Sequence, residues 1–238
     1  MKTLKVRLTL TEEALGMMPT SKEVHEEFIA SKAPDAPSIE EEVEAIGVEE
    51  VVEKQKTVFP RMDDGTPFFW DYQMRGMIKD ALGMLKRATG TIASKMTAYK
   101  KIVDGLIFVQ ERKIPIHMGG ESGDCQRPLR ASGPSGERVA LAHSETIPAG
   151  SWIEFTFELW KDDLDDAIRE CLDYGRRRGL AQWRNSGKGT FEWDELDDDG
   201  NIIGGNHTEE GRKAAAAMKA KKAEKAKKEA EKKAAKSA

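Results

Sequence analysis

The chain has 238 residues, with 38 Lys and Arg against 42 Asp and Glu, a formal net charge of −4 at pH 7 and 39% hydrophobic residues. No stretch approaches the 18 or more apolar residues of a membrane span, and the N-terminus lacks the apolar core of a secretion signal. Cys125 and Cys171 follow neither a disulfide framework nor a CxxC spacing, so free thiols are expected. These features exclude a membrane protein and favour a soluble, intracellular one.

The small net charge hides segments of opposite sign. Residues 12–53 carry −11 and residues 192–211 carry −8, whereas residues 54–191 carry +4 and residues 212–238 carry +8. Because the segments cancel in the sum, the local distribution of charge is more informative about partners than the average.

The first half of the chain predicts one strand, an acidic insertion and one long helix. Apolar and polar residues alternate over residues 2–10, as in a half-buried strand. Residues 12–60 form an acidic insertion with short helices expected over 21–32 and 38–46. A helix is then predicted from Asp71 to Arg87, with an apolar stripe of Met74, Met77, Ile78, Ala81, Leu82 and Leu85.

The second half predicts strands, a loop and a second helix. Residues 106–116 contain one or two short strands, where Pro115 suggests an edge or a bulge. Residues 117–137 have the Gly, Ser and Pro content of a flexible loop. Residues 138–143 and 151–160 are predicted to pair with each other as strands around a turn at 148–150.

The next helix is predicted over 162–178, because acidic residues begin it and three arginines end it, in agreement with the helix dipole. Its apolar stripe is Leu164, Ala167, Ile168, Cys171, Leu172 and Gly175. Gly179 is its expected C-cap, and a final strand is predicted over 190–193. Strand, helix, strands, helix and strand in this order predict an α+β fold of ferredoxin-like type, with an antiparallel sheet and helices on one face.

Cationic and glycine residues are densest between residues 176 and 189. The segment contains Arg176, Arg177, Arg178, Gly179, Trp183, Arg184, Gly187, Lys188 and Gly189. Glycines let main-chain N–H groups approach phosphate oxygens, Arg and Lys supply positive charge, and a Trp can stack on an unpaired base. The segment is not a phosphate-binding Walker A loop, because Gln182 and Gly189 stand where that motif needs Gly and Ser or Thr. A purely structural role, with arginines complementing a helix end and glycines forming a turn, is the alternative.

Three segments in the same order resemble the RAMP superfamily, the ferredoxin-like RNA-binding proteins of CRISPR effector complexes. Residues 67–80 resemble the family's "IPGSSLKGxLR" entry to its first helix, with Gln73-Met74-Arg75-Gly76 over SLKG, although Asp71-Tyr72 replaces the family's pair of small residues. Residues 144–155 are similar to its "EvlPaGtxFxF" hairpin, and residues 176–189 are similar to its C-terminal glycine-rich loop. The whole chain looks more like proteins of bacteriophages and prophages.

The resemblance implies a modified ferredoxin-like (RRM- or RAMP-like) domain over 1–195. Composition adds an acidic linker over 196–211 and a Lys/Ala-rich tail over 212–238 that is helical or disordered. The resemblance also implies a phage-encoded, cytoplasmic protein of a bacterial host cell that binds RNA or single-stranded DNA through the backbone, with possible self-association. The segment from 176 to 189 would make the main contacts. Secondary contacts would come from Arg75, Lys79, Arg127 and Arg130.

Two other classes of function stay open. The first is a metal-independent endoribonuclease with His117 or His143 as acid–base, and the second is a protein–protein assembly or counter-defence factor. The acidic residues 194–200 lack the spacing of a calcium-binding EF-hand. No catalytic residue, metal or cofactor is therefore assigned.

Overall fold

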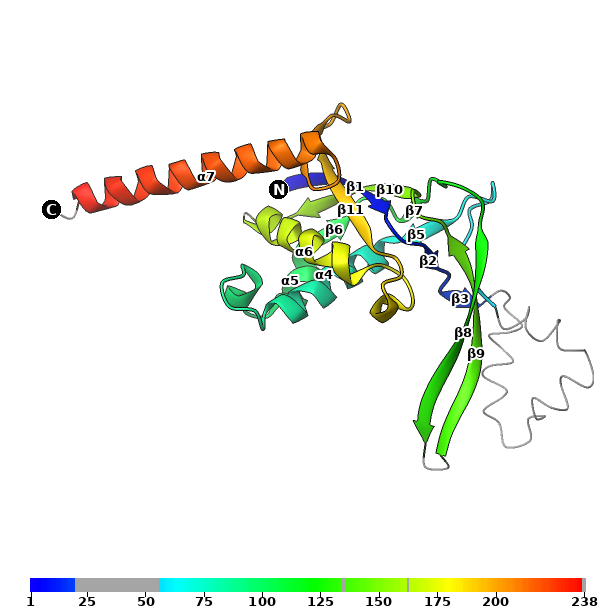
Figure 1. Ribbon diagram of the computed structural model, residues 1–238. Helices are drawn as coiled ribbons and strands as arrows, with labels where there is room; N and C mark the ends of the chain where they lie inside the picture. Colours follow the sequence, from blue (N-terminus) through cyan, green and yellow to red (C-terminus); the bar gives the residue numbers. More distant parts are fainter. Residues whose placement is uncertain (20–55, 134–135, 162, 237–238) are drawn as a thin grey trace, which may run out of the picture.

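The computed structural model describes residues 1–19, 56–133, 136–161 and 163–236 (Figure 1). The main sheet has the strand order β12-β11-β1-β10-β6, and all neighbours are antiparallel. The strands of this sheet are β1 (Lys2–Leu10), β6 (Ile107–Val109), β10 (Trp152–Leu159), β11 (Phe191–Leu196) and β12 (Ile202–Gly205). The two long helices that belong to the same unit are α4 (Asp71–Leu85) and α6 (Leu164–Arg178).

The order of these elements along the chain and in the sheet defines the fold. The chain runs β1-α4-β6-β10-α6-β11, and the four strands lie side by side as β11-β1-β10-β6. This is the split β-α-β arrangement of a ferredoxin-like fold, with β12 added at one edge. The predicted α+β fold class is thus confirmed.

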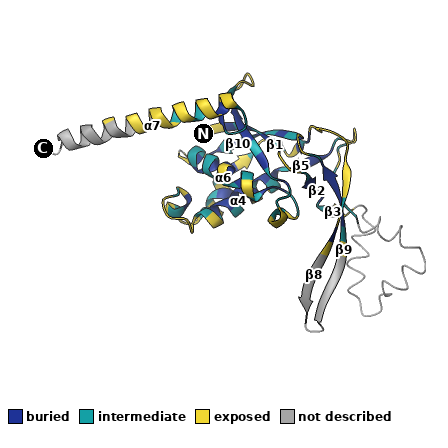
Figure 2. Ribbon diagram, in the orientation of Figure 1, coloured by how far each residue is buried: buried dark blue, intermediate teal, exposed yellow. Residues whose placement is uncertain are grey.

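The core lies between one face of this sheet and the two long helices. The inward residues of β1 pair with those of β10, as in Val6 opposite Phe155, and all are buried. The helix stripes predicted from the sequence face them, and Ile78 of α4 and Leu172 of α6 are among the fully buried residues. Figure 2 shows this buried layer between the sheet and the helices. Because apolar residues alternate in the strands and recur every three or four residues in the helices, one face of each element is apolar and meets here.

The segment 117–137, predicted as a flexible loop, instead contains the first strand of a long hairpin, whose second strand includes the predicted strand 138–143. The strands β8 (Gly123–Gly133) and β9 (Gly136–Ile147) pair in antiparallel register along their whole length, and the hairpin projects from the body (Figure 1). The predicted pairing of 138–143 with 151–160 is therefore wrong. On its other edge, β9 pairs with β2 (Ala14–Leu15) and β4 (Thr57–Val58), and β4 pairs with β3 (Met18–Pro19).

Shorter elements complete the described part of the chain. The strands β5 (Phe68–Trp70) and β7 (Lys113–Pro115) form a two-stranded sheet, so Pro115 stands at an edge as expected. The helices η1 (Ala93–Lys95) and α5 (Tyr99–Leu106) lie next to α4 and were not predicted. The helices expected over 21–32 and 38–46 lie outside the described residues.

The predicted acidic linker contains β12, which pairs with β11 after a turn at 197–200. The tail forms one helix, α7 (Glu209–Lys236), whose first turns contact β12 and whose remainder extends away from the body (Figure 1). Among the described residues, no helix combines the length and the apolar character needed to cross a bilayer.

Candidate nucleic-acid interface

The segment 176–189, which we call the Arg/Gly loop, connects the end of α6 to β11. Two glycines hold its ends together: a Cβ on Gly179 would lie 2.5 Å from the Lys188 carbonyl oxygen, and one on Gly189 would lie 2.1 Å from the Leu180 carbonyl oxygen. Both glycines have positive φ angles, of 79° and 68°. The Leu180 amide donates to the Gly189 carbonyl at 2.8 Å. Only glycine satisfies both the positive φ and the close backbone approach, so these positions fix the shape of the loop.

Trp183 lies at the tip of the loop, before a short 3-10 helix that spans residues 184–186. Its φ angle is 55°, and its side chain is 37% exposed. The guanidinium of Arg127, from β8, lies 5.2 Å from the centre of the Trp183 ring. One face of the indole is thereby supported by the hairpin, and the side chain offers an exposed aromatic surface on a loop of defined shape.

Arg127 is a structural residue in this arrangement. It is 4% exposed, and it donates to Ser144 Oγ at 3.0 Å and to Gln182 Oε1 at 2.9 Å. The sequence placed Arg127 in a flexible loop as a secondary contact, whereas the structure buries it between β9 and the Arg/Gly loop. Its role here is to join the two. Arg130 follows on β8, where its backbone pairs with Val139, but its side chain lies outside the described residues.

Most cations of the Arg/Gly loop are paired with carboxylates from other elements. Asp80 of α4 accepts from Arg178 Nε at 3.2 Å and from Arg184 Nη1 at 3.1 Å. Arg178 also donates to Asn185 Oδ1 at 2.6 Å. Since Asp80 is 98 and 104 residues away from these two arginines, the pairing depends on the packing of α4 beside α6.

Lys188 fastens the far end of the loop to the segment after β1. Its Nζ lies 2.8 Å from Glu13 Oε1 and 3.3 Å from Glu12 Oε2. The hydrogen bond to Glu13 is the main cause that raises the pKa of Lys188 above its ordinary value. The Gly189 amide also donates to the Glu13 carbonyl at 2.8 Å. This end of the loop is therefore held by both side-chain and backbone contacts.

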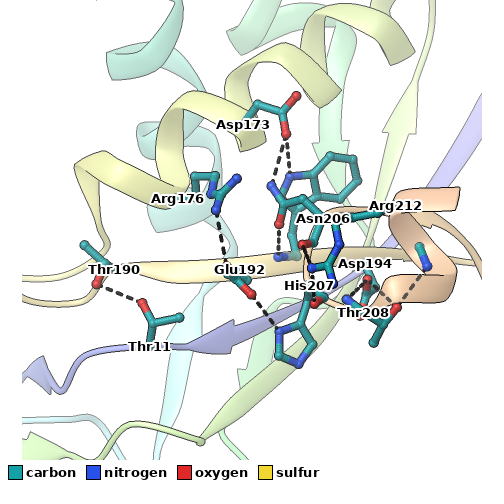
Figure 3. Close-up of polar contacts among 12 residues, drawn as sticks. Thr11, Asp173, Arg176, Thr190, Glu192, Asp194, Asn206, His207, Thr208 and Arg212 are labelled. Carbon is teal, nitrogen blue, oxygen red and sulfur yellow. Dashed lines mark hydrogen bonds and ion pairs between the residues drawn. The ribbon is translucent and has the colours of Figure 1, made fainter. Parts of the chain in front are cut away.

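The remaining arginines differ in their surroundings. Arg176 Nη2 lies 3.2 Å from Glu192 Oε1, whose other oxygen lies 3.1 Å from His207 Nδ1. Figure 3 shows this row from α6 across β11 to the segment before α7. Arg177 is exposed, and within the described part of the chain no carboxylate is paired with it. Arg177 is thus the cation of the loop that is available without breaking an ion pair.

Polar contacts also fix β11, the strand that follows the Arg/Gly loop. Asp173 Oδ1 accepts from Trp193 Nε1 and from Asn206 Nδ2, both at 3.1 Å, and the Asp194 carboxylate accepts from Thr208 (Figure 3). Glu195 in turn pairs with Arg169 of α6, so Glu192, Asp194 and Glu195 are all internal partners at this edge of the sheet.

Arg75 and Lys79, the two secondary contacts predicted on α4, are also paired. Arg75 Nη2 lies 3.1 Å from Asp71 Oδ2, and Lys79 Nζ lies 2.6 Å from Asp104 Oδ1. Their positive charges are therefore already matched by carboxylates of α4 and α5.

The two histidines considered for catalysis have different environments. His117 stacks on Trp152 with ring centres 3.7 Å apart, and it lines a shallow cavity of about 470 Å³ together with Arg61 and Asp64. His143 is 8% exposed, and neither of its ring nitrogens has a hydrogen-bond partner among the described residues. The described residues also contain no group of three His, Cys, Asp or Glu side chains placed to hold a metal ion.

Comparisons with known proteins yield a single kind of match. No protein-family model matches the chain, and no curated protein does. A solved structure described as the type III-B Cmr-beta bound to cognate target RNA contains a chain that superimposes with a TM-score of 0.48 and 12% sequence identity. The match covers 81% of this chain and 59% of the length of that one.

Proposed function

We propose that this protein is a RAMP-like nucleic-acid-binding protein that binds RNA or single-stranded DNA through the backbone, with the Arg/Gly loop as the main contact. The observation that carries the proposal is the loop itself: an exposed Trp183 stands among cationic side chains on a frame fixed by Gly179 and Gly189. Arginines suit phosphates, and an aromatic ring held by the protein suits an unpaired base.

The ion pairs of the loop shape how binding would proceed. Phosphates would contact Arg177 directly and would replace the Asp80 carboxylate at Arg178 and Arg184. Because arginine forms charge-assisted hydrogen bonds with carboxylate and with phosphate oxygens, the two arginines would keep their positions and exchange one anion for another. The basic helix α7 adds a sequence-independent attraction for the same polymer.

The resemblance to phage proteins and to RAMP backbone subunits supports two further parts of the proposal. The protein would act in the cytoplasm of an infected bacterium, and copies of it would associate along one nucleic-acid chain. Sedimentation of the protein with and without a long oligonucleotide tests the second part, because side-by-side assembly requires complexes that grow with the length of the oligonucleotide.

The test is fluorescence anisotropy with labelled single-stranded RNA and DNA of about 20 nucleotides, at increasing salt. We expect binding at low salt that weakens as salt rises, and substantial loss of affinity in the variant Arg177→Glu/Arg178→Glu. The control Lys95→Glu/Lys101→Glu makes the same change of net charge on exposed residues away from the loop. Absence of binding by the unaltered protein at low salt would refute the proposal, as would equal affinity of the two variants.

A second candidate function is metal-independent RNA cleavage, and the position of His117 favours it. Its imidazole lies at a solvent-open cavity beside Arg61, so an acid–base group and a cation face the same space. Incubation of labelled RNA with the protein and with His117→Ala distinguishes the candidates. RNA cut by the unaltered protein and left intact by the variant supports cleavage, whereas RNA left intact by both excludes it.

A further inference from the structure

A hollow lies on the solvent face of α4. It has a volume of about 380 Å³, and we call its lining the α4 hollow: Gly76, Lys79, Asp80, Gly83, Met84, Arg87, Tyr99 and Lys100. Gly76 and Gly83 are seven residues apart, so they lie on one face of α4 about two turns from each other. Among the described residues, nothing lies within 4 Å of the position that a Cβ on Gly76 would take, so the helix surface leaves room for a ligand there.

Tyr99 of α5 forms one wall of the α4 hollow. Its hydroxyl oxygen lies 2.9 Å from the position that a Cβ on Gly83 would take, so a larger residue at 83 would displace the ring. The ring is partly buried against the hydrophobic core, and Lys86 Nζ lies 6.0 Å from its centre. The hydroxyl group is therefore held in place beside Gly83 of α4.

The charge of the hollow is positive. Lys79, Arg87 and Lys100 line it; Lys79 is paired with Asp104, and Asp80, the acidic residue of this lining, is bonded to Arg178 and Arg184. Arg87 and Lys100 are exposed, and no ion pair joins either to another described residue. A site with unpaired cations and a hydroxyl donor suits the oxygens of a phosphate group.

The α4 hollow and the Arg/Gly loop meet at Asp80, which lines the first and accepts hydrogen bonds from the second. We propose that the α4 hollow is a second phosphate-binding site, which receives backbone phosphates of the same single-stranded chain that the Arg/Gly loop binds. This inference rests on the proposed function. Arg87 and Lys100 would contact phosphate oxygens, and the Tyr99 hydroxyl would donate a hydrogen bond to one of them.

The experiment measures anisotropy with two labelled oligonucleotides, one of about 20 nucleotides and a dinucleotide, whose single phosphodiester group can occupy only one of the two sites at a time. The variant is Arg87→Glu/Lys100→Glu, and the control is Lys95→Glu/Lys101→Glu, whose residues are exposed and lie outside the hollow. Circular dichroism checks that both fold, and Arg87→Gln/Lys100→Gln repeats the test without introducing acidic groups.

We expect the variant to lose about 10-fold or more in affinity for the long oligonucleotide and to keep its affinity for the short one. The slope of log affinity against log salt should fall by about 1.4, the value for two phosphate contacts on a single strand. Equal binding of the long oligonucleotide by variant and control would overturn the inference, and so would an equal loss for both oligonucleotides. If Arg177→Glu/Arg178→Glu still loses binding in that case, the proposed function stands without the second site.

Discussion

Asp80 holds two arginines of the candidate interface, so its removal should affect stability and binding in opposite directions. The substitution Asp80→Asn keeps the size of the side chain and removes its charge. Arg178 and Arg184 then lose the carboxylate that they share at 3.2 and 3.1 Å. The folded protein loses two ion pairs. A phosphate that binds Arg178 and Arg184 then no longer has to displace the Asp80 carboxylate from them.

The size of both effects follows from the exposure of the groups. The side chains of Asp80, Arg178 and Arg184 are all about one-third exposed, at 32%, 31% and 31%. Ion pairs near the surface contribute about 0.2–1 kcal/mol each, so the free energy of unfolding should fall by about 0.4–2 kcal/mol. If phosphate binding normally breaks both pairs, affinity should rise by about 2- to 30-fold, since 1.4 kcal/mol corresponds to a factor of ten.

Urea unfolding measures the first effect, and anisotropy with a single-stranded oligonucleotide at about 50 mM salt measures the second. Asp63→Asn is the matched control, because it makes the same change of charge at an exposed residue to which no described residue is joined by an ion pair. Unchanged or weaker binding by Asp80→Asn than by Asp63→Asn would refute the view that Asp80 occupies a phosphate position.

Further predictions concern the frame, the aromatic tip and the far end of the Arg/Gly loop. Gly189→Ala should lower the free energy of unfolding by about 2–5 kcal/mol in urea titrations, because a left-handed alanine costs about 1–2 kcal/mol and two backbone hydrogen bonds would also be disturbed. Gly187 also has a positive φ, of 83°, but open space around it among the described residues, so Gly187→Ala should cost only about 1–2 kcal/mol, and equal losses would contradict the proposed frame. Trp183→Ala should weaken binding of single strands by about 1–3 kcal/mol in anisotropy, whereas Trp183→Phe, which keeps an aromatic ring, should lose less affinity. Unchanged affinity of Trp183→Ala would argue against stacking. The pKa of Lys188 is raised by Glu13, so the contribution of this pair is fully present below the ordinary value of 10.5 and is lost as pH rises through the higher folded value. Unfolding measured up to that range should show a smaller alkaline loss in Lys188→Met than in the unaltered protein, and identical profiles would contradict the assignment.

The ferredoxin-like core could be predicted from local pattern. In β10 the inward residues alternate with outward ones, and in α6 the buried residues recur at helical spacing and agree with the stripe read from the sequence. These patterns are periodic within one element, so they do not depend on knowledge of distant partners. The dense charge and glycine content of residues 176–189 was visible in the same way.

The hairpin β8–β9 could not be predicted from composition. Gly123, Pro128 and Gly133 gave its first strand the appearance of a loop, although regular pairing with β9 satisfies the backbone all along its length. A strand pattern also does not name its partner. The turn around Pro148 suggested pairing of β9 with β10, whereas β9 pairs with β8, β2 and β4.

The sequence by itself determined which segments form the core and where positive charge is concentrated. Only the tertiary structure decided which cations are free. It buries Arg127 beneath Trp183, places Asp80 between two arginines, and leaves Arg177 exposed. The physical reason is that hydrophobic periodicity acts within a helix or strand, while ion pairing acts through space between residues that packing brings within about 4 Å.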